Sequence, residues 1–260
     1  MYHRFKQRPL EQLLPWAVPV LLIVIWQVCA QIGWLSSRVL PAPTAVIQAA
    51  IQLASTGELV RNVYVSAVRA LIGFAIGGVI GFAFGLLNGT FRVFEQLFDT
   101  SIQMLRNIPH LALIPLVILW FGIGDQGRIF LVAIGVLFPI YINTFHGIRT
   151  VDQGLLEMGR VYGLRPWELF WQIILPSALP SILVGVRFAL GIMWLTLIVA
   201  ETIAADSGIG YMAMNAREFL QTDVVVFSIL LYALLGKLAD AIARLLEARL
   251  LQWHPSYQTT

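Results

Sequence analysis

The segment from Gly154 to Pro176 combines charged, aromatic and turn-forming residues just before a long apolar run. Gly163 lies six positions after Glu157, and nine residues separate Gly163 from the sequence Ile173–Pro176. Glycine can adopt a positive φ and Pro166 can begin a helix, so the spacing predicts two short helices joined by a turn. Its apolar residues are unusually many for a solvated loop, which indicates docking to a partner protein.

A second group of residues has the types needed to contact a charged solute. Arg187 interrupts the otherwise uncharged stretch 169–200, so it lies near the middle of a run long enough to cross a membrane. A charged residue at that depth suggests a functional role by default. The structural alternative is an ion pair with an acidic residue of another span. Glu201 and Asp206, at the end of the run, are expected in a solvated loop. The candidate residues of a translocation path are Arg187, Asn143, Trp194 and Glu201.

Patterns for enzymatic chemistry are missing from the sequence. His110 and His146 have no metal-ligand partner three or four positions away, and neither H-E-x-x-H nor G-x-S-x-G occurs. Lys6 and Lys237 are the only lysines, and neither belongs to a phosphate-binding P-loop. We therefore predict no catalytic residue, no metal site and no cofactor bound by this chain.

The elements that must position these residues are membrane helices. Of the 260 residues, 58% are hydrophobic and 12% charged, against about 45–50% and 25% in soluble domains. A helix that crosses about 30 Å of hydrocarbon needs about 20 mostly uncharged residues. We predict an all-α polytopic membrane protein with a single transmembrane domain over residues 1–260 and a cytoplasmic loop over 149–172. The six expected spans are about 13–35, 68–90, 104–123, 128–148, 173–200 and 223–245, the last held by a pairing of Lys237 with Asp240.

Charge distribution predicts the orientation. With six spans, most Lys and Arg residues, including Arg4, Arg8 and Arg106, fall on the side of the termini, whereas Arg69 falls on the other side. The positive-inside rule then places both termini in the cytoplasm. This orientation accounts for the net charge of +3 without nucleic acid. A cleaved signal sequence is the alternative for the first span, but its uncharged stretch 12–37 exceeds the 7–15 residues of a signal core.

Small residues recur in the second span. Gly73, Gly77, Gly81 and Gly85 follow one another at steps of four. Such a ladder lets two helix backbones approach closely in lipid. It predicts tight packing within one subunit, with pairing between subunits as the alternative.

The spacing in 154–176 resembles the signature of permease subunits of ATP-binding-cassette (ABC) importers, which is Glu-Ala-Ala, three residues, Gly, nine residues, Ile-x-Leu-Pro. Met158 and Gly159 stand where the two alanines usually occur. The resemblance implies the architecture of a type I ABC importer permease, with a coupling helix that fits a groove of the ATPase subunit. It assigns that role to Glu157, Gly159, Tyr162, Gly163, Leu164, Pro166, Phe170, Leu175 and Pro176.

Further segments are similar to the nitrate, taurine and sulfonate permease group, and residues 194–202 and 213–223 are most similar to aliphatic sulfonate permeases. The resemblance implies a homodimer in the lipid of the bacterial inner membrane, with two ATPase subunits that bind ATP and Mg, and a periplasmic sulfonate-binding protein. The alternative solutes are taurine, nitrate and a thiamine-precursor pyrimidine. An ion-coupled secondary transporter or an intramembrane enzyme is less favoured, because neither a clear repeat nor a catalytic constellation is visible.

Overall fold

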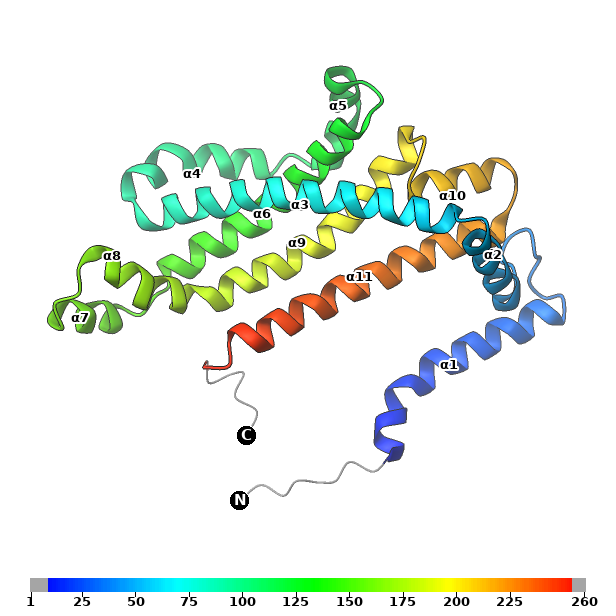
Figure 1. Cartoon of the computed structure of the whole chain (residues 1–260), viewed down its shortest axis with the longest axis horizontal. Coiled ribbons are helices and arrows are strands. Elements are labelled where there is room, and N and C mark those ends of the chain that lie inside the picture. Colours follow the sequence, from blue (N-terminus) through cyan, green and yellow to red (C-terminus); the bar gives the residue numbers. More distant parts are fainter. Residues whose placement is uncertain (1–8, 254–260) are drawn as a thin grey trace. The chain divides into compact units, whose positions relative to one another are not determined.

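The structure is a computed structural model that describes residues 9–253, except for the side chains of residues 9–16 and of Ala204. Within this range every regular element is helical (Figure 1). The sequence predicts one transmembrane domain over 1–260. By packing, the described chain forms two compact units, the first from residues up to Arg61 and from Met212–Leu230, the second from Asn62–Tyr211 and from Leu231 onward.

The first unit contains α1 (Pro9–Gln31) and α2 (Pro43–Ser55), with parts of α10 (Ile209–Glu218) and α11 (Thr222–Leu250). Pro43 begins α2, where its missing N–H costs nothing. The Gln27 side chain accepts a 3.3 Å hydrogen bond from the backbone N–H of Thr44 and ties the two helices together. The first expected span, 13–35, corresponds to α1, which ends at Gln31. The basic residues Arg4, Lys6 and Arg8 lie outside the described residues.

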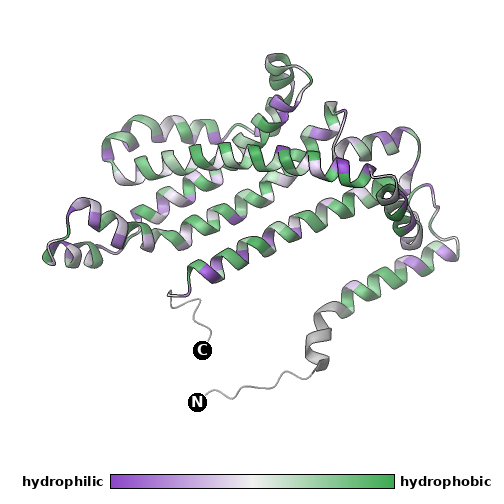
Figure 2. Cartoon of the chain, in the orientation of Figure 1, coloured by the Kyte–Doolittle hydropathy of each residue, from purple (hydrophilic) through white to green (hydrophobic). Residues whose placement is uncertain are grey.

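Four helices of the described chain are long and apolar enough to cross a membrane: α3 (Glu58–Thr90), α6 (Asp125–Arg149), the continuous stretch Pro166–Ile203 that contains most of α9 (Leu175–Ala204), and α11. Figure 2 shows hydrophobic residues along most of their lengths. The last expected span, 223–245, lies within one uninterrupted helix of 29 residues. In that helix Lys237 Nζ lies 3.7 Å from Asp240 Oδ2.

The third expected span, 104–123, is not one helix. α4 (Arg92–Arg106) is followed by a break and then by η1 (His110–Leu113) and α5 (Ile114–Phe121), with a bend of 80° between the two parts. Pro109 lacks an N–H and disfavours helical backbone at Ile108, which explains the break. Apolar residues on both sides of it line a cavity with Ile134 and Phe138 from the middle of α6. Arg106 therefore ends α4 inside the stretch that was expected to form one span, and its cytoplasmic position stays a prediction.

Two acidic residues of α4 contact α6. Tyr141 of α6 donates a 2.8 Å hydrogen bond to Asp99, and Glu95 forms an ion pair with Arg149. Leu97 and other apolar residues of α4 are exposed. The exposed apolar residues suit contact of part of the helix surface with lipid. The broken pair α4–α5 thus supplies a fifth candidate span.

The glycine ladder lies against α6 within the same chain. A Cβ atom at Gly73 would lie 2.6 Å from Val132 Cγ1, and one at Gly85 would lie 2.7 Å from Thr144 Cβ. At Gly77 the added atom would overlap the carbonyl group of Ala133. Only residues without a side chain allow this backbone approach. On the other face of α6, residues such as Val136 form a core with Met193 and Leu197 of α9.

Candidate functional site

The chain between α6 and α9, which we call the connecting segment (residues 153–174), consists of α7 (Gln153–Val161), α8 (Pro166–Leu169) and a π-helical turn, η2 (Phe170–Ile174), that continues into α9. Asp152 caps α7 by accepting a 2.6 Å hydrogen bond from the Gly154 N–H. α7 ends in a Schellman motif. Gly163 has φ +78°, its N–H donates to Arg160 O at 3.0 Å, and the Leu164 N–H donates to Gly159 O at 3.0 Å.

Two small features fold α7 back onto the helices that follow it. Gly159 is buried, and a Cβ atom there would lie 2.7 Å from Ile173 Cδ1. Pro166 begins α8, and the Glu168 carboxylate accepts a 2.8 Å hydrogen bond from the Arg165 N–H. The segment therefore has a defined shape at one end of the α6–α9 pair (Figure 1).

The outer surface of the connecting segment is apolar and aromatic. Val161, Tyr162 and Trp167 are 86%, 79% and 70% exposed. The rings of Trp167 and Trp171 lie edge to face at 5.4 Å, which presents one continuous aromatic surface. Of the nine residues that the resemblance assigns to coupling, Glu157, Tyr162, Gly163 and Pro166 are exposed, Gly159 is buried, and Leu164, Phe170, Leu175 and Pro176 are half-buried.

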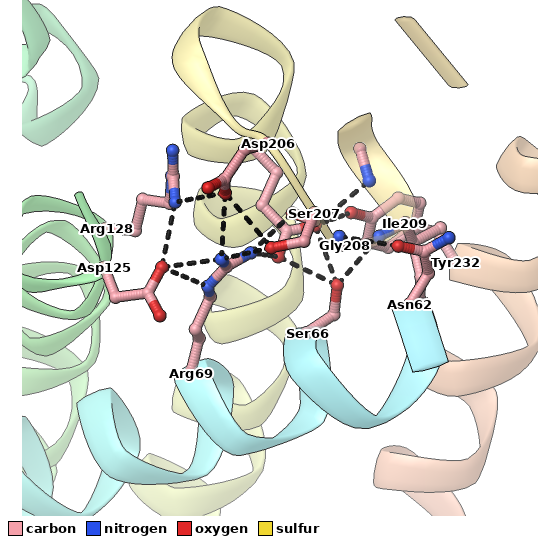
Figure 3. A network of polar contacts seen from close by, with 12 residues as sticks. Asn62, Ser66, Arg69, Asp125, Arg128, Asp206, Ser207, Gly208, Ile209 and Tyr232 are labelled. Carbon is pink, nitrogen blue, oxygen red and sulfur yellow. Dashed lines mark hydrogen bonds and ion pairs between the residues drawn. The ribbon is translucent and has the colours of Figure 1, made fainter. Parts of the chain in front are cut away.

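At the opposite end of α9, polar contacts converge on Glu201, and Figure 3 shows its partners Ser66, Arg69 and Tyr232. Its carboxylate accepts hydrogen bonds from Ser66 Oγ at 2.8 Å, Arg69 Nη1 at 3.0 Å, Gly210 N–H at 3.0 Å and Tyr232 OH at 3.0 Å. The side chains of Arg69 and Glu201 are 3% and 0% exposed. A buried charge is tolerated only with this degree of pairing.

Further contacts extend this arrangement, which we call the Glu201 network: Asn62, Ser66, Arg69, Asp125, Arg128, Glu201, Asp206–Gly210 and Tyr232. Arg69 Nη2 lies 2.6 Å from Asp125 Oδ1, and Arg69 Nη1 donates to Ser207 O at 2.6 Å. The Gly208 N–H donates to Asn62 Oδ1 at 2.9 Å. Asp206 is 89% exposed, and its pKa is lowered by backbone hydrogen bonding at its own position and by Ser207. The network fixes the turn after α9 to α3 and α6.

Glu201 was expected in a solvated loop, and this expectation is wrong. The residue lies within α9, whose last turns are covered by α3 and by the turn itself. Sequence reasoning also missed Asn62, Ser66 and Arg69. Their spacing of four and three residues places them on one face of a helix, a signal that the sequence contains.

The four candidate residues of a path do not lie together. Asn143 packs where α6 meets α9, because a Cβ atom at Gly185 would lie 2.7 Å from Asn143 Cβ. Trp194 packs against the core and meets the Tyr232 ring at 6.4 Å. Glu201 accepts a hydrogen bond from that same Tyr232, so Trp194 and Glu201 share a neighbour, whereas Asn143 and Arg187 lie elsewhere. Arg187 faces α11, where its Nε donates a 2.8 Å hydrogen bond to Asp240.

Curated relatives match almost the whole chain. The putative aliphatic sulfonates transport permease protein SsuC of Escherichia coli (strain K12) is 63% identical over 243 residues, which cover 94% of this chain and 92% of that protein. SsuC of Bacillus subtilis (strain 168) is 46% identical over 241 residues, covering 93% and 87%. The taurine transport system permease protein TauC of E. coli is 32% identical over 242 residues, covering 91% and 88%.

Solved structures share the fold. A structure of the MetNI methionine ABC transporter aligns with a TM-score of 0.57 at 21% identity, covering 74% of this chain and 97% of that one. An amino acid ABC transporter solved with histidines aligns with a TM-score of 0.59 at 15% identity, covering 75% and 97%. Residues 77–252 match the family described as binding-protein-dependent transport system inner membrane component. The chain therefore belongs to this family and has the all-α fold of a type I ABC importer permease.

Proposed function

We propose that this chain is the transmembrane subunit of an ATP-driven importer that moves aliphatic sulfonates across the bacterial inner membrane. The observation that carries the proposal is the 63% identity, over 94% of the chain, to a protein described as an aliphatic sulfonate permease. The sequence identity to the taurine permease is about half of that value, at 32%. The sulfonate group is common to both solutes, so an aliphatic sulfonate is the solute class that the proposal names.

In this proposal the connecting segment transmits the motion of a separate ATPase. Its exposed aromatic surface supplies the kind of anchor that dominates protein interfaces, since Trp and Tyr bury much area with few rotatable bonds. The Schellman turn at Gly163 and the packing at Gly159 make the segment stiff enough to pass a displacement on to α9. The chain itself hydrolyses no ATP, and the nucleotide and Mg stay on the partner.

The assembly that we propose has two copies of this chain, two ATPase subunits and a periplasmic sulfonate-binding protein. The connecting segment faces the cytoplasm together with both termini, and the Glu201 network faces the periplasm. This orientation is supported by the Lys and Arg bias of the sequence. Alternating access then exposes a path between the two copies to either side in turn.

The test is uptake of labelled ethanesulfonate into proteoliposomes that contain this chain, a partner ATPase and a sulfonate-binding protein. We expect uptake to need all three proteins and ATP. The double variant Tyr162→Glu/Trp167→Glu should weaken ATPase association at least about tenfold, because it removes two exposed aromatic anchors. Arg160→Gln, at an exposed position of the same connecting segment, is the matched control and should leave association unchanged.

Three results would each contradict a part of the proposal. Flux through this chain alone would show that ATP is not the energy source. Uptake that is equally fast with the aromatic residues replaced would show that the connecting segment does not couple the subunits. Import of nitrate in preference to ethanesulfonate would refute the named solute class and leave the importer class intact, whereas a preference for taurine would narrow the solute within that class.

A further inference from the structure

Five charged residues face one another between α9 and α11, and we call them the α9–α11 charge cluster: Arg187, Lys237, Asp240, Arg244 and Glu247. Asp240 lies at the centre, with its oxygens 2.8 Å from Arg187 Nε, 2.7 Å from Arg244 Nη2 and 3.7 Å from Lys237 Nζ. Arg187 Nη1 also lies 3.8 Å from Glu247 Oε2. The spacing of three and four residues along α11 makes this a stripe on one helix face.

The charges of this cluster do not balance. It has three cations and two carboxylates, so it is one negative charge short of neutral. Lys237 and Arg244 are 69% and 48% exposed, so the cluster presents its excess positive charge at an accessible surface that an anion can reach. A single monoanion would neutralise the cluster. A sulfonate group carries one negative charge at every physiological pH.

A cavity of about 370 Å³ opens beside the cluster, within the range of about 300–1,000 Å³ typical of small-molecule sites. It is lined by Val184, Arg187, Phe188, Gly191, Gly236 and Asp240. A Cβ atom at Gly191 or Gly236 would meet nothing within 4 Å, so both glycines leave the space open. The cavity thus offers a cation for an anionic head and apolar walls for a short alkyl chain.

Arg187 retains hydrogen-bonding capacity in this position. Its side chain is 42% exposed, and its guanidinium carries five N–H donors. Within the described residues its Nε donates to Asp240, and its Nη1 contact with Glu247 is longer than a hydrogen bond. A second anion can therefore approach Arg187 while Asp240 remains held by Arg244.

We propose that this cavity is a transit site for the imported solute, in which the sulfonate group binds Arg187 and Asp240 competes for the same guanidinium. The competition keeps binding weak, which a transport path requires because a tightly bound solute does not leave. While the solute is bound, Lys237 and Arg244 hold Asp240 in place. When the solute departs, Asp240 forms its ion pair with Arg187 again. The inference rests on the proposed function and names the residues that recognise its solute.

The first test measures binding of labelled ethanesulfonate to the permease–ATPase complex in lipid nanodiscs without the binding protein. Asp240→Asn removes the competing carboxylate, so the affinity should rise about tenfold, the scale of one charge-assisted hydrogen bond. Arg187→Gln should abolish binding, and the double variant should lose the gain of Asp240→Asn. Arg249→Gln, exposed in the last turn of the same helix, is the control and should bind like the unaltered protein.

A second test does not disturb the ion pairs. Gly236→Leu should fill the cavity without a backbone clash and lower ethanesulfonate uptake at least about tenfold, with assembly and basal ATPase activity retained. The inference is wrong if uptake by Gly236→Leu is normal. It is also wrong if Arg187→Gln and Asp240→Asn lower thermal stability alike and leave binding unchanged, which is the result for a purely structural ion pair.

The two proposals fail in different ways. If the unaltered complex with its binding protein imports no ethanesulfonate, the proposed function is wrong. If it imports ethanesulfonate and the cavity variants do so equally well, the function stands and the transit site is refuted.

Discussion

Glu201 shows how strongly a single residue depends on its surroundings in this fold. Its carboxylate has four hydrogen-bond donors from the three helices α3, α10 and α11, and it is fully buried. In the apolar interior the carboxylate and its donors satisfy one another, and each would be costly to leave without a hydrogen bond. Removing one partner of a buried ion pair leaves the other partner charged and unsolvated.

We predict that Glu201→Gln lowers the free energy of unfolding by about 3–5 kcal/mol, because Arg69 loses a buried counterion. Chemical denaturation of the protein in detergent measures the change. Asp206→Asn is the control, since Asp206 is 89% exposed and lies 3.9 Å from Arg69 and Arg128. Its effect should stay within about 1 kcal/mol. Equal losses in both variants would show that burial of Glu201 does not matter.

At the scale of elements, the contact between α3 and α6 depends on glycine spacing. The ladder places Gly77 directly against the backbone of Ala133. At Gly78, the next residue, a Cβ atom would lie 3.4 Å from Ile140 Cδ1, an ordinary contact with the end of a side chain of α6. An added methyl group is therefore expected to clash at Gly77 and to be accommodated at Gly78.

Gly77→Ala should destabilise the protein by about 1–3 kcal/mol through overpacking against α6. Gly78→Ala should be neutral or stabilising by up to about 1 kcal/mol, because alanine favours a helix over glycine. Thermal unfolding of the two variants side by side decides the matter. A similar loss in both would mean that the close approach of α3 and α6 does not occur.

The turn between α7 and α8 makes a second prediction at this scale. Gly163 has φ +78° and is exposed to solvent. A substitution there therefore changes mainly the energy of the left-handed backbone conformation. Alanine pays about 1–2 kcal/mol for a left-handed conformation, whereas asparagine adopts it more readily. ATP-dependent uptake should therefore decrease in the order Gly163, Gly163→Asn, Gly163→Ala. An alanine variant that works better than the asparagine variant would contradict this order.

At the scale of the whole molecule, α6 and α9 separate two functional ends. The connecting segment joins one end of this helix pair, and the Glu201 network surrounds the other end of α9 (Figure 1, Figure 3). If the pair crosses the membrane, exposed residues at the two ends face opposite compartments. Tyr162 and Asp206 are exposed and mark the two ends.

We predict that Tyr162→Cys and Asp206→Cys react with a membrane-impermeant thiol reagent from opposite sides, after the single cysteine, Cys29, is replaced by serine. In intact spheroplasts Asp206→Cys should be labelled and Tyr162→Cys protected, since we expect the connecting segment in the cytoplasm. Inverted vesicles should give the reverse result. Labelling of both sites from one side would refute the predicted topology.

Patterns that are local in the sequence determined much of this protein. Long uncharged stretches predict apolar helices, because the membrane requires each span to satisfy its own backbone. The glycine at 163, the proline at 166 and their spacing from Glu157 predict two short helices with a turn, and the structure has α7, a Schellman motif and α8 at these positions. These features depend on neighbours within a few residues, so one sequence suffices to see them.

Only the tertiary structure decided which polar residues meet. Arg69 and Glu201 lie 132 positions apart, and Arg187 and Asp240 lie 53 apart. The burial of Glu201 and the partner of Arg187 both follow from how helices pack. Such pairings are set by helix packing and not by local preference, because each helix buries its polar groups wherever a complementary group of another helix lies.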